Sequence, residues 1–260
     1  DELSSVSYVG GAANATENIR VRANDGLGWG AWKSWKMTTS GFQQGGAGND
    51  TIAGTASDIL LGGAGNDSLN TPSGNGLLSG GEGSDAMTGG SGSDFYVGDS
   101  GNDTLTTGSG NDVISFNAGD GQDTVHLGGG GDTLSLGGGT RYQDLALSKN
   151  GNDLVLNTGD SESITFKDWY ADINKQSVLN LQVIADTLAG FDQQGSDSLL
   201  DDQVEVFDFK VLVNHFDQAR AADANLSSWN AMDALLDAHL FGADDAALGG
   251  DLAYQYAHYG

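Results

Sequence analysis

Between residues 41 and 139 the sequence repeats itself about every nine residues. The stretch GGAGNDTIA at residues 45–53 returns as GGAGNDSLN at residues 62–70. An aspartate, or Gly76 where an aspartate is due, recurs at steps of 8, 9, 9, 9, 9, 9, 9, 11 and 9 residues. The residue two places later is always apolar: Ile52, Leu60, Leu69, Leu78, Met87, Tyr96, Leu105, Ile114, Val125 and Leu134. This constant relation predicts a stack of similar structural units and argues against a disordered acidic segment.

Each repeat reads as a six-residue turn followed by a three-residue strand, so that two repeats, 18 residues, complete one coil of a flattened helix. Strands on successive coils would lie about 4.8 Å apart, with one apolar side chain of each strand inside. Burying a Leu or Ile contributes roughly 1.5–3 kcal/mol. Ordering the backbone costs about 1–2 kcal/mol per residue. Such a thin core cannot fold the repeats by itself.

The charge of the repeats indicates what else is required. The chain has 10 basic and 36 acidic residues, a net charge of −26, which disfavours nucleic acid and anionic membranes as partners. Residues 37–140 hold twelve acids and no Lys or Arg. Stacked aspartates would repel by roughly 0.5–1 kcal/mol per pair, while glycines with positive φ allow carbonyl oxygens to converge. With no cysteine in the chain, these oxygens predict a hard cation, calcium rather than magnesium, whose binding is inseparable from folding.

The turns GGAGND, GGEGSD, GGSGSD and GDSGND resemble the calcium-binding nonapeptide repeats of RTX (repeats-in-toxin) proteins. The resemblance covers residues 41–139. It implies a mainly β fold: a parallel β-roll with a flanking β-strand cap and a C-terminal helical segment.

In that family, one ion lies between equivalent turns of adjacent coils. The earlier turn gives its Asp and two carbonyls, and the next turn on that side gives further carbonyls. Row one then contains Asp50, Asp67, Asp85 and Asp103, and row two contains Asp58, Asp94 and Asp112; Asp123 and Asp132 close the two rows. The resemblance implies backbone or side-chain ligands at Gly46, Gly48, Gly62, Gly63, Ala64, Gly65, Asn66, Gly80, Gly81, Glu82, Gly83, Ser84, Gly90, Gly92, Gly98, Ser100, Gly101, Asn102, Thr107, Gly108, Ser109, Gly110, Asn111, Ala118, Asp120 and Gly129. Carbonyls of the turns that begin at Thr71 and Leu127 belong to the same scheme.

Row two departs from the family pattern near its start. The turn at residues 71–76, TPSGNG, has Gly76 in place of the Asp and Pro72 in its second place, and the turn at residues 54–58 is one residue short. Because the number of charged ligands sets calcium affinity, we expect about five to seven ions, four on row one and fewer on row two. The site beside Gly76 is expected to stay empty, with Asn75 or water there at best.

The flanking segments have other patterns. Residues 1–40 alternate Ile19, Val21 and Ala23 and then present three tryptophans, Trp29, Trp32 and Trp35. We interpret them as the end of a β-sandwich-like module, with the tryptophans in packing rather than in a sugar platform. Alternating apolar residues predict antiparallel hairpins in a cap over residues 140–180, and the ending ITFKDWY resembles the cap of many RTX proteins.

Residues 181–260 are predicted to be mostly helical and near the secretion signal. Val204, Phe207, Val211 and Phe216 have helical spacing. Ser227 or Ser228 is expected to cap a second helix, which Gly242 ends. The acids between residues 192 and 208 are expected to form a solvated linker or helix start. No stretch is apolar enough to span a membrane. Because Asp1 is not an initiator Met, we expect a piece of a longer chain.

The chain is not predicted to be an enzyme. GDSGN at Gly98 resembles a protease nucleophile motif, but Ser100 is in register with the repeats, and neither HExxH nor GxSxG occurs. The four histidines share no ligand spacing: His126, His215, His239 and His258.

The resemblance favours a calcium-binding region that folds on extracellular calcium and supports type I secretion and surface display of a large bacterial adhesin. It implies a secreted or cell-surface location. The expected partners are calcium, the type I secretion machinery and an unknown surface or host ligand that other parts of the full protein bind; we expect a monomer. The alternative is the C-terminal roll of a secreted enzyme, namely a protease, lipase or alginate epimerase. The β-sandwich-like start favours the adhesin.

Overall fold

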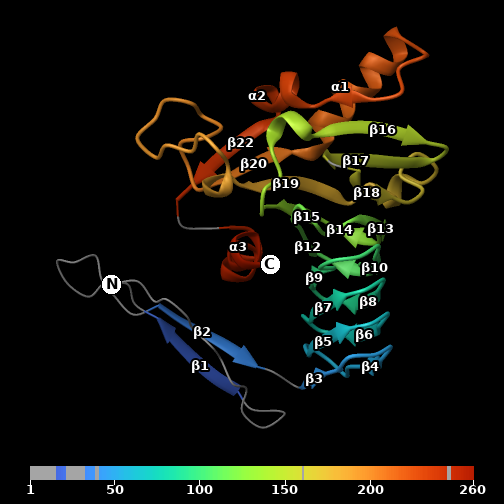
Figure 1. Cartoon of the computed structure of the whole chain (residues 1–260), viewed down its shortest axis with the longest axis vertical. Helices are drawn as coiled ribbons and strands as arrows, with labels where there is room; N and C mark the ends of the chain where they lie inside the picture. The colour runs from blue at the N-terminus through green and yellow to red at the C-terminus, as the bar shows by residue number, and fades with distance from the viewer. Residues whose placement is uncertain (1–15, 22–32, 39–40, 160, 245–246) are drawn as a thin grey trace.

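The computed structural model describes the main chain of residues 16–21 and 33–38, and residues 41–159, 161–244 and 247–260 in full. It confirms the mainly β prediction. A β-solenoid of about five turns forms the repeat region, and a β-rich cap with two of the helices covers its upper end (Figure 1).

The roll has two walls of parallel strands. Within each wall, neighbouring strands are one coil apart in the sequence. The first wall runs through β3 (Phe42–Gln44), β5 (Ile59–Ala64), β7 (Leu77–Glu82), β9 (Phe95–Val97), β12 (Val113–Phe116) and β15 (Asp132–Leu136). The second wall contains β4 (Thr51–Ala53), β6 (Ser68–Ser73), β8 (Ala86–Ser91), β10 (Thr104–Thr106), β13 (Gln122–His126), β11 (Ser109–Gly110) and β14 (Gly129–Gly130). Several strands are six residues long because turn residues also pair between coils, such as Gly63 with Gly81.

The ten predicted apolar positions form the core of the roll, as expected. In the first wall, register places Leu60, Leu78, Tyr96, Ile114 and Leu134 directly above one another. In the second wall the corresponding column is Ile52, Leu69, Met87, Leu105 and Val125. All ten side chains are buried, the most exposed being Ile52 at 7%. The nine-residue period therefore gave the inward face correctly.

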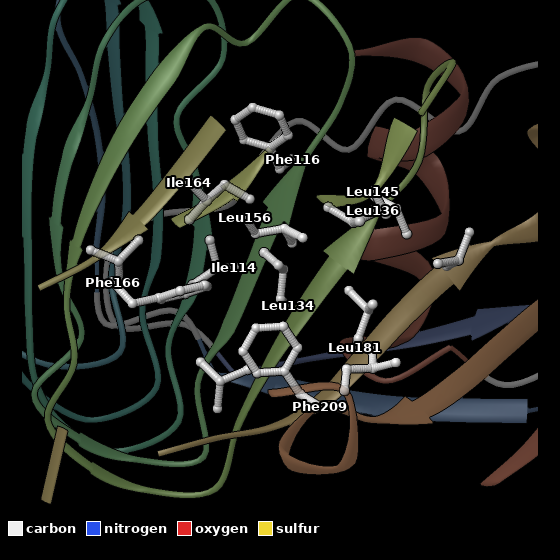
Figure 2. Packing of buried hydrophobic residues seen from close by; sticks show 14 of the residues in the cluster. Ile114, Phe116, Leu134, Leu136, Leu145, Leu156, Ile164, Phe166, Leu181 and Phe209 are labelled. Carbon is white, nitrogen blue, oxygen red and sulfur yellow. The ribbon is translucent and has the colours of Figure 1, made fainter. Parts of the chain in front are cut away.

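The cap closes the roll by extending both walls. In the second wall, β18 (Glu162–Phe166) pairs in parallel with β13 and continues antiparallel through β17 (Asp153–Gly159), β16 (Ala146–Asn150) and β21 (Trp229–Asn230). The predicted hairpins are therefore present. In the first wall, β19 (Val178–Ile184) pairs in parallel with β15 and is followed by β20 (Val204–Asp208) and β22 (His239–Ala243). Side chains from the roll and the cap meet in one core that includes Ile114, Leu134, Leu156, Ile164 and, from α1 (Phe209–Ala222), Phe209 (Figure 2).

The structure corrects two details of the C-terminal prediction. Val204 and Phe207 lie in strand β20, and the helix begins only at Phe209. The predicted second helix is the single turn α2 (Leu235–Ala238), and Gly242 lies in β22. The first error has a clear cause: residues 204–207 are buried on both faces between β19 and β22, and such a strand lacks the alternation that identifies strands in a sequence.

The last helix, α3 (Gly250–Tyr259), returns to the outside of the first wall. Ala253 and Tyr256 pack against Phe95 and Val97 of β9, and Ala257 packs against residues of β19 and β20 (Figure 1). Short 3₁₀ turns connect other elements: Tyr142–Asp144, Ile173–Lys175, Ala185–Thr187 and Met232–Ala234. Among the described residues, no helix is both long enough and apolar enough to cross a membrane.

Ahead of the roll, β1 (Thr16–Val21) and β2 (Lys33–Thr38) form an antiparallel ribbon. The β-sandwich-like module remains a prediction. Trp29 and Trp32 lie outside the described residues, as does the side chain of Trp35, so the interpretation of the tryptophans also stays a prediction.

Candidate calcium-binding site

The turns between the two walls lie in two rows along opposite edges of the roll (Figure 1). Row one leads from the first wall to the second, at residues 45–50, 62–67, 80–85, 98–103 and 118–123. Row two leads back, at residues 54–58, 71–76, 89–94, 107–112 and 127–132. The fold thus gathers the sequence-predicted ligand residues on these two edges. Their individual roles as ligands remain predictions.

A ladder of aspartates links the coils of row one. Oδ1 of each Asp accepts a hydrogen bond from the backbone N–H of the Asp one coil earlier. The distances are 2.8 Å from Asp50 to Asp67, 2.7 Å from Asp67 to Asp85, 2.8 Å from Asp85 to Asp103 and 2.9 Å from Asp103 to Asp123. Row two repeats the pattern from Gly76 to Asp94, Asp112 and Asp132. One oxygen of each carboxylate is therefore used to fix its orientation.

The second oxygen of five of these carboxylates is buried and has no hydrogen-bond partner. This holds for Oδ2 of Asp67, Asp85, Asp94, Asp103 and Asp112, all of whose residues are at most 2% exposed. A buried charged oxygen without a partner is strongly unfavourable. A positively charged partner would compensate this cost. Residues 37–140 contain no Lys or Arg, so the repeats themselves do not provide one.

The unpartnered oxygens of Asp67, Asp85, Asp94 and Asp103 lie close to the first glycine of their own turns, and at Gly62 a carbonyl of the next coil arrives as well. A methyl group on Gly62 would lie 2.3 Å from Asp67 Oδ2 and 2.4 Å from the carbonyl oxygen of Gly80. On Gly45 it would lie 2.5 Å from Asp50 Oδ2, which accepts from the N–H of Gly46, and 2.3 Å from the carbonyl oxygen of Gly62. Any side chain would fill this cradle. Its carboxylate and carbonyl oxygens are the donors that calcium prefers, so the residues present fit that ion.

Burial raises the pKa of six ladder carboxyl groups, because charged forms lose water there: those of Asp85, Asp94, Asp103, Asp112, Asp123 and Asp132. The pKa of Asp94 rises to about 6 and that of Asp103 and Asp112 to about 7. For Asp123 the same cause gives a pKa of about 8, with the charges of Asp103 and Asp120 adding to it. Without a cation, the folded roll therefore favours protonated ladder groups.

The residue before each Asp makes a second ladder in the opposite direction. The side-chain oxygen of Asn66 accepts from the N–H of Ser84, and that of Asn102 from the N–H of Gln122. Asn75 and Asn111 do the same in row two. These side chains hold neighbouring coils together, and Asn75 is engaged in this way instead of replacing the aspartate missing at Gly76.

Several predicted carbonyl ligands also accept an inter-coil hydrogen bond: Gly46, Glu82, Gly98, Ser100, Gly108, Ser109 and Asp120. A carbonyl has a second lone pair for an ion.

Row two has side chains of the protein in or beside its cradles. Beside Gly76, a methyl group would lie 3.0 Å from Cγ2 and 3.1 Å from Oγ1 of Thr71, a fully buried residue. The hydroxyl of Tyr96 lies at the next turn of row two, residues 89–94. It is 3.0 Å from the carbonyl oxygen of Thr107, which begins the turn after that. A methyl group on Gly89 would meet that hydroxyl at 1.9 Å and Asp94 Oδ2 at 2.4 Å.

The ends of row two are engaged by polar groups as well. At the upper end, Lys175 Nζ donates to the carbonyl oxygen of Leu127 at 2.8 Å, and Ser177 Oγ donates to Asp132 Oδ2 at 2.5 Å. At the lower end, Asp58 Oδ2 accepts from the N–H of Thr55 at 2.6 Å. Sequence reasoning missed these groups. Only Tyr96 could have been recognised from the sequence, because it is the one inward-facing position of the repeats that has a hydroxyl group.

The upper end of row one contacts helix α3. The hydroxyl of Tyr256 donates to Asp120 Oδ2 at 2.8 Å, and its carbonyl oxygen accepts from Asn117 Nδ2 at 2.7 Å. Tyr256 also hydrogen-bonds Asp99, whose pKa burial raises. These contacts join residues 136 and 139 positions apart in the sequence, so no local pattern predicts them.

The repeat region matches the family model described as the RTX calcium-binding nonapeptide repeat, with overlapping matches at residues 44–69, 53–87, 61–96, 73–105, 88–121, 97–134 and 115–141. Residues 44–141 are RTX calcium-binding repeats. The RTX prediction is thereby confirmed for the roll. RTX repeats are typical of secreted bacterial proteins. No curated protein matches the chain.

Proposed function

We propose that this calcium-binding RTX region folds on extracellular calcium and supports type I secretion and surface display of a large bacterial adhesin. The observation that carries the proposal is the row of buried carboxylate oxygens without partners, at Asp67, Asp85 and Asp103 in row one. They make the closed roll unfavourable without a cation and favourable with one.

Calcium concentration then decides where the region folds. In the bacterial cytosol, where free calcium is submicromolar, the repulsion between ladder groups keeps the repeats unfolded and fit for export. Outside the cell, millimolar calcium occupies the cradles and the roll closes. The secreted character of RTX repeats supports this direction. In this role the region binds calcium and carries no catalysis of its own.

The adhesin part of the proposal draws on the segment ahead of the roll. The ribbon of β1 and β2 precedes the first coil directly, which supports an upstream β module and not a catalytic one. The ligand of the adhesin belongs to other parts of the full protein, and the region itself acts as a monomer. A catalytic module immediately upstream in the full protein would contradict this role and favour the roll of a secreted enzyme.

Far-ultraviolet circular dichroism of the chain, with chelator and then with millimolar calcium, tests the folding step. We expect the strand signal of residues 41–139 to be lost in chelator and restored by calcium, with millimolar magnesium as the matched control. A strand signal that chelation leaves unchanged contradicts the proposal. For the surface role, bacteria that express the full protein with and without residues 41–260 should differ in display of its upstream part, measured with an antibody on intact cells.

A further inference from the structure

A second group of carboxylates lies outside the repeats, where the acidic loop ahead of β20 enters the cap. Asp201, Asp202 and Glu205 each bring one carboxylate oxygen to within 4.8 Å of the others. No sequence pattern separates these residues from the other acids between residues 192 and 208, which read as a solvated linker. In the structure, they converge because β20 pairs with β22 and draws the end of the loop against it.

Glu205 makes this group different from an ordinary acidic surface. Its side chain is fully buried. Oε2 lies 2.6 Å from Nε2 of His239 on the neighbouring strand β22, whereas Oε1 is buried and makes no hydrogen bond. One oxygen is thus held by a histidine, and the other is buried without a hydrogen-bond partner in the same group of carboxylates. Burial of such an oxygen is costly unless a cation compensates it.

The surroundings of Asp202 place its carboxylate over a glycine and add negative charge to it. Register places Gly242 of β22 opposite Glu205. A methyl group on Gly242 would lie 2.1 Å from Asp202 Oδ2, so the carboxylate of Asp202 occupies the space above this glycine. Asp201 and Asp244 add negative charge at Asp202. The described ion pairs of Lys and Arg side chains lie elsewhere, at Asp144, Asp153 and Asp217.

We propose that Asp201, Asp202 and Glu205 form a calcium site of the cap, separate from the two rows of the roll. Three carboxylates are hard oxygen donors of the kind that calcium takes. His239 acts as the orienting group, since its ring N–H on Oε2 fixes the carboxylate so that Oε1 is left for the ion. An ion there ties the acidic loop to β20 and β22, the strands that extend the first wall of the roll.

The site is tested on the full chain by counting calcium after equilibrium dialysis and by locating it in anomalous difference maps from crystals grown in calcium. We expect a peak between Asp202 and Glu205, and one calcium fewer per chain in Asp202→Asn and in Glu205→Gln. Asp197→Asn is the matched control, because this exposed acid lies in the same loop and should keep the parental count.

Asp202 is only partly buried, so its variant keeps the test informative if Glu205→Gln fails to fold. The map of the parental chain is independent of both variants. An unchanged count in Asp202→Asn, or a map with ions in the rows and none at Glu205, overturns the proposal. A zinc ion ligated by His239, with calcium excluded, also overturns it.

Discussion

Row one and row two of the roll are built from the same repeat but have different contents. In row one, Asp50, Asp67, Asp85 and Asp103 follow without a break, and the turns of these four aspartates begin with glycine: Gly45, Gly62, Gly80 and Gly98. In row two one Asp is missing, two turns begin with Thr71 and Thr107, and groups from Tyr96 and Lys175 reach carbonyl oxygens of the turns. A single repeat therefore gives one edge that depends on added cations and another that the chain's own polar groups partly satisfy.

The largest effect is expected from the carboxylates of row one. Asp85→Ala and Asp103→Ala each remove an unpartnered ligand oxygen and should weaken calcium binding about tenfold or more, because ligand charge sets affinity. Asp99→Ala is the comparison, because the Asp99 side chain bonds Ser79 and Tyr256. Isothermal titration calorimetry measures the three affinities.

Asp99 has φ of 61°, where Ala is strained and Asn is tolerated. Asp99→Asn therefore serves as the control that removes charge without strain. If either Asp99 variant binds calcium more weakly than Asp85→Ala, the assignment of ligands along row one is wrong.

Row two can be rebuilt toward row one. Gly76→Asp restores the missing carboxylate but crowds Thr71, so we expect the double variant Thr71→Gly, Gly76→Asp to bind one more calcium per chain than the parent. Thr71→Gly alone is the matched control and should add none.

Crystals of the parent in millimolar calcium should show four ions along row one, fewer along row two and none beside Gly76. A six-coordinate ion beside Gly76 in the parent would mean that carbonyls suffice there.

The calcium-free roll should lose stability as pH rises. The ladder carboxyl groups have an ordinary pKa near 3.8 in the unfolded chain, but burial raises the pKa to about 6 for Asp94, about 7 for Asp103 and about 8 for Asp123 in the fold. Protons thus bind the folded state more tightly, and the stability they add is full below about pH 4 and lost by about pH 8. The strand signal in chelator, compared at pH 5 and pH 8.5, measures this, and it should be weaker at pH 8.5. Greater stability at pH 8.5 would contradict the buried, uncompensated ladder.

The smallest effect concerns the contact of α3 with row one. Tyr256→Phe removes the hydroxyl that donates to Asp120 and should lower the free energy of unfolding by about 1–2 kcal/mol, without changing the calcium count. Tyr259→Phe is the matched control, because Tyr259 is 81% exposed. Chemical unfolding in calcium gives both values. Equal stability of Tyr256→Phe and the parent would show that this hydroxyl contributes nothing measurable to the docking of the helix.

The roll was largely predictable because its residues interact with equivalents one coil away. The nine-residue period gave the inward positions Ile52 to Leu134 and the alignment of the aspartates on two edges. The cap was less predictable. The spacing of Val204 and Phe207 suits a helix, and only pairing with β19 and β22 makes these residues a strand.

The sequence by itself determined the repeat, its inward apolar positions, the acidic rows and the break at Gly76, since each follows from spacing within about 18 residues. The tertiary structure alone decided that Tyr96 fills a cradle of row two, that Tyr256 closes row one and that Glu205 is buried beside His239. These contacts bring together side chains whose positions depend on how whole elements pack. Burial and orientation of a polar group depend on that packing, and no local pattern contains it.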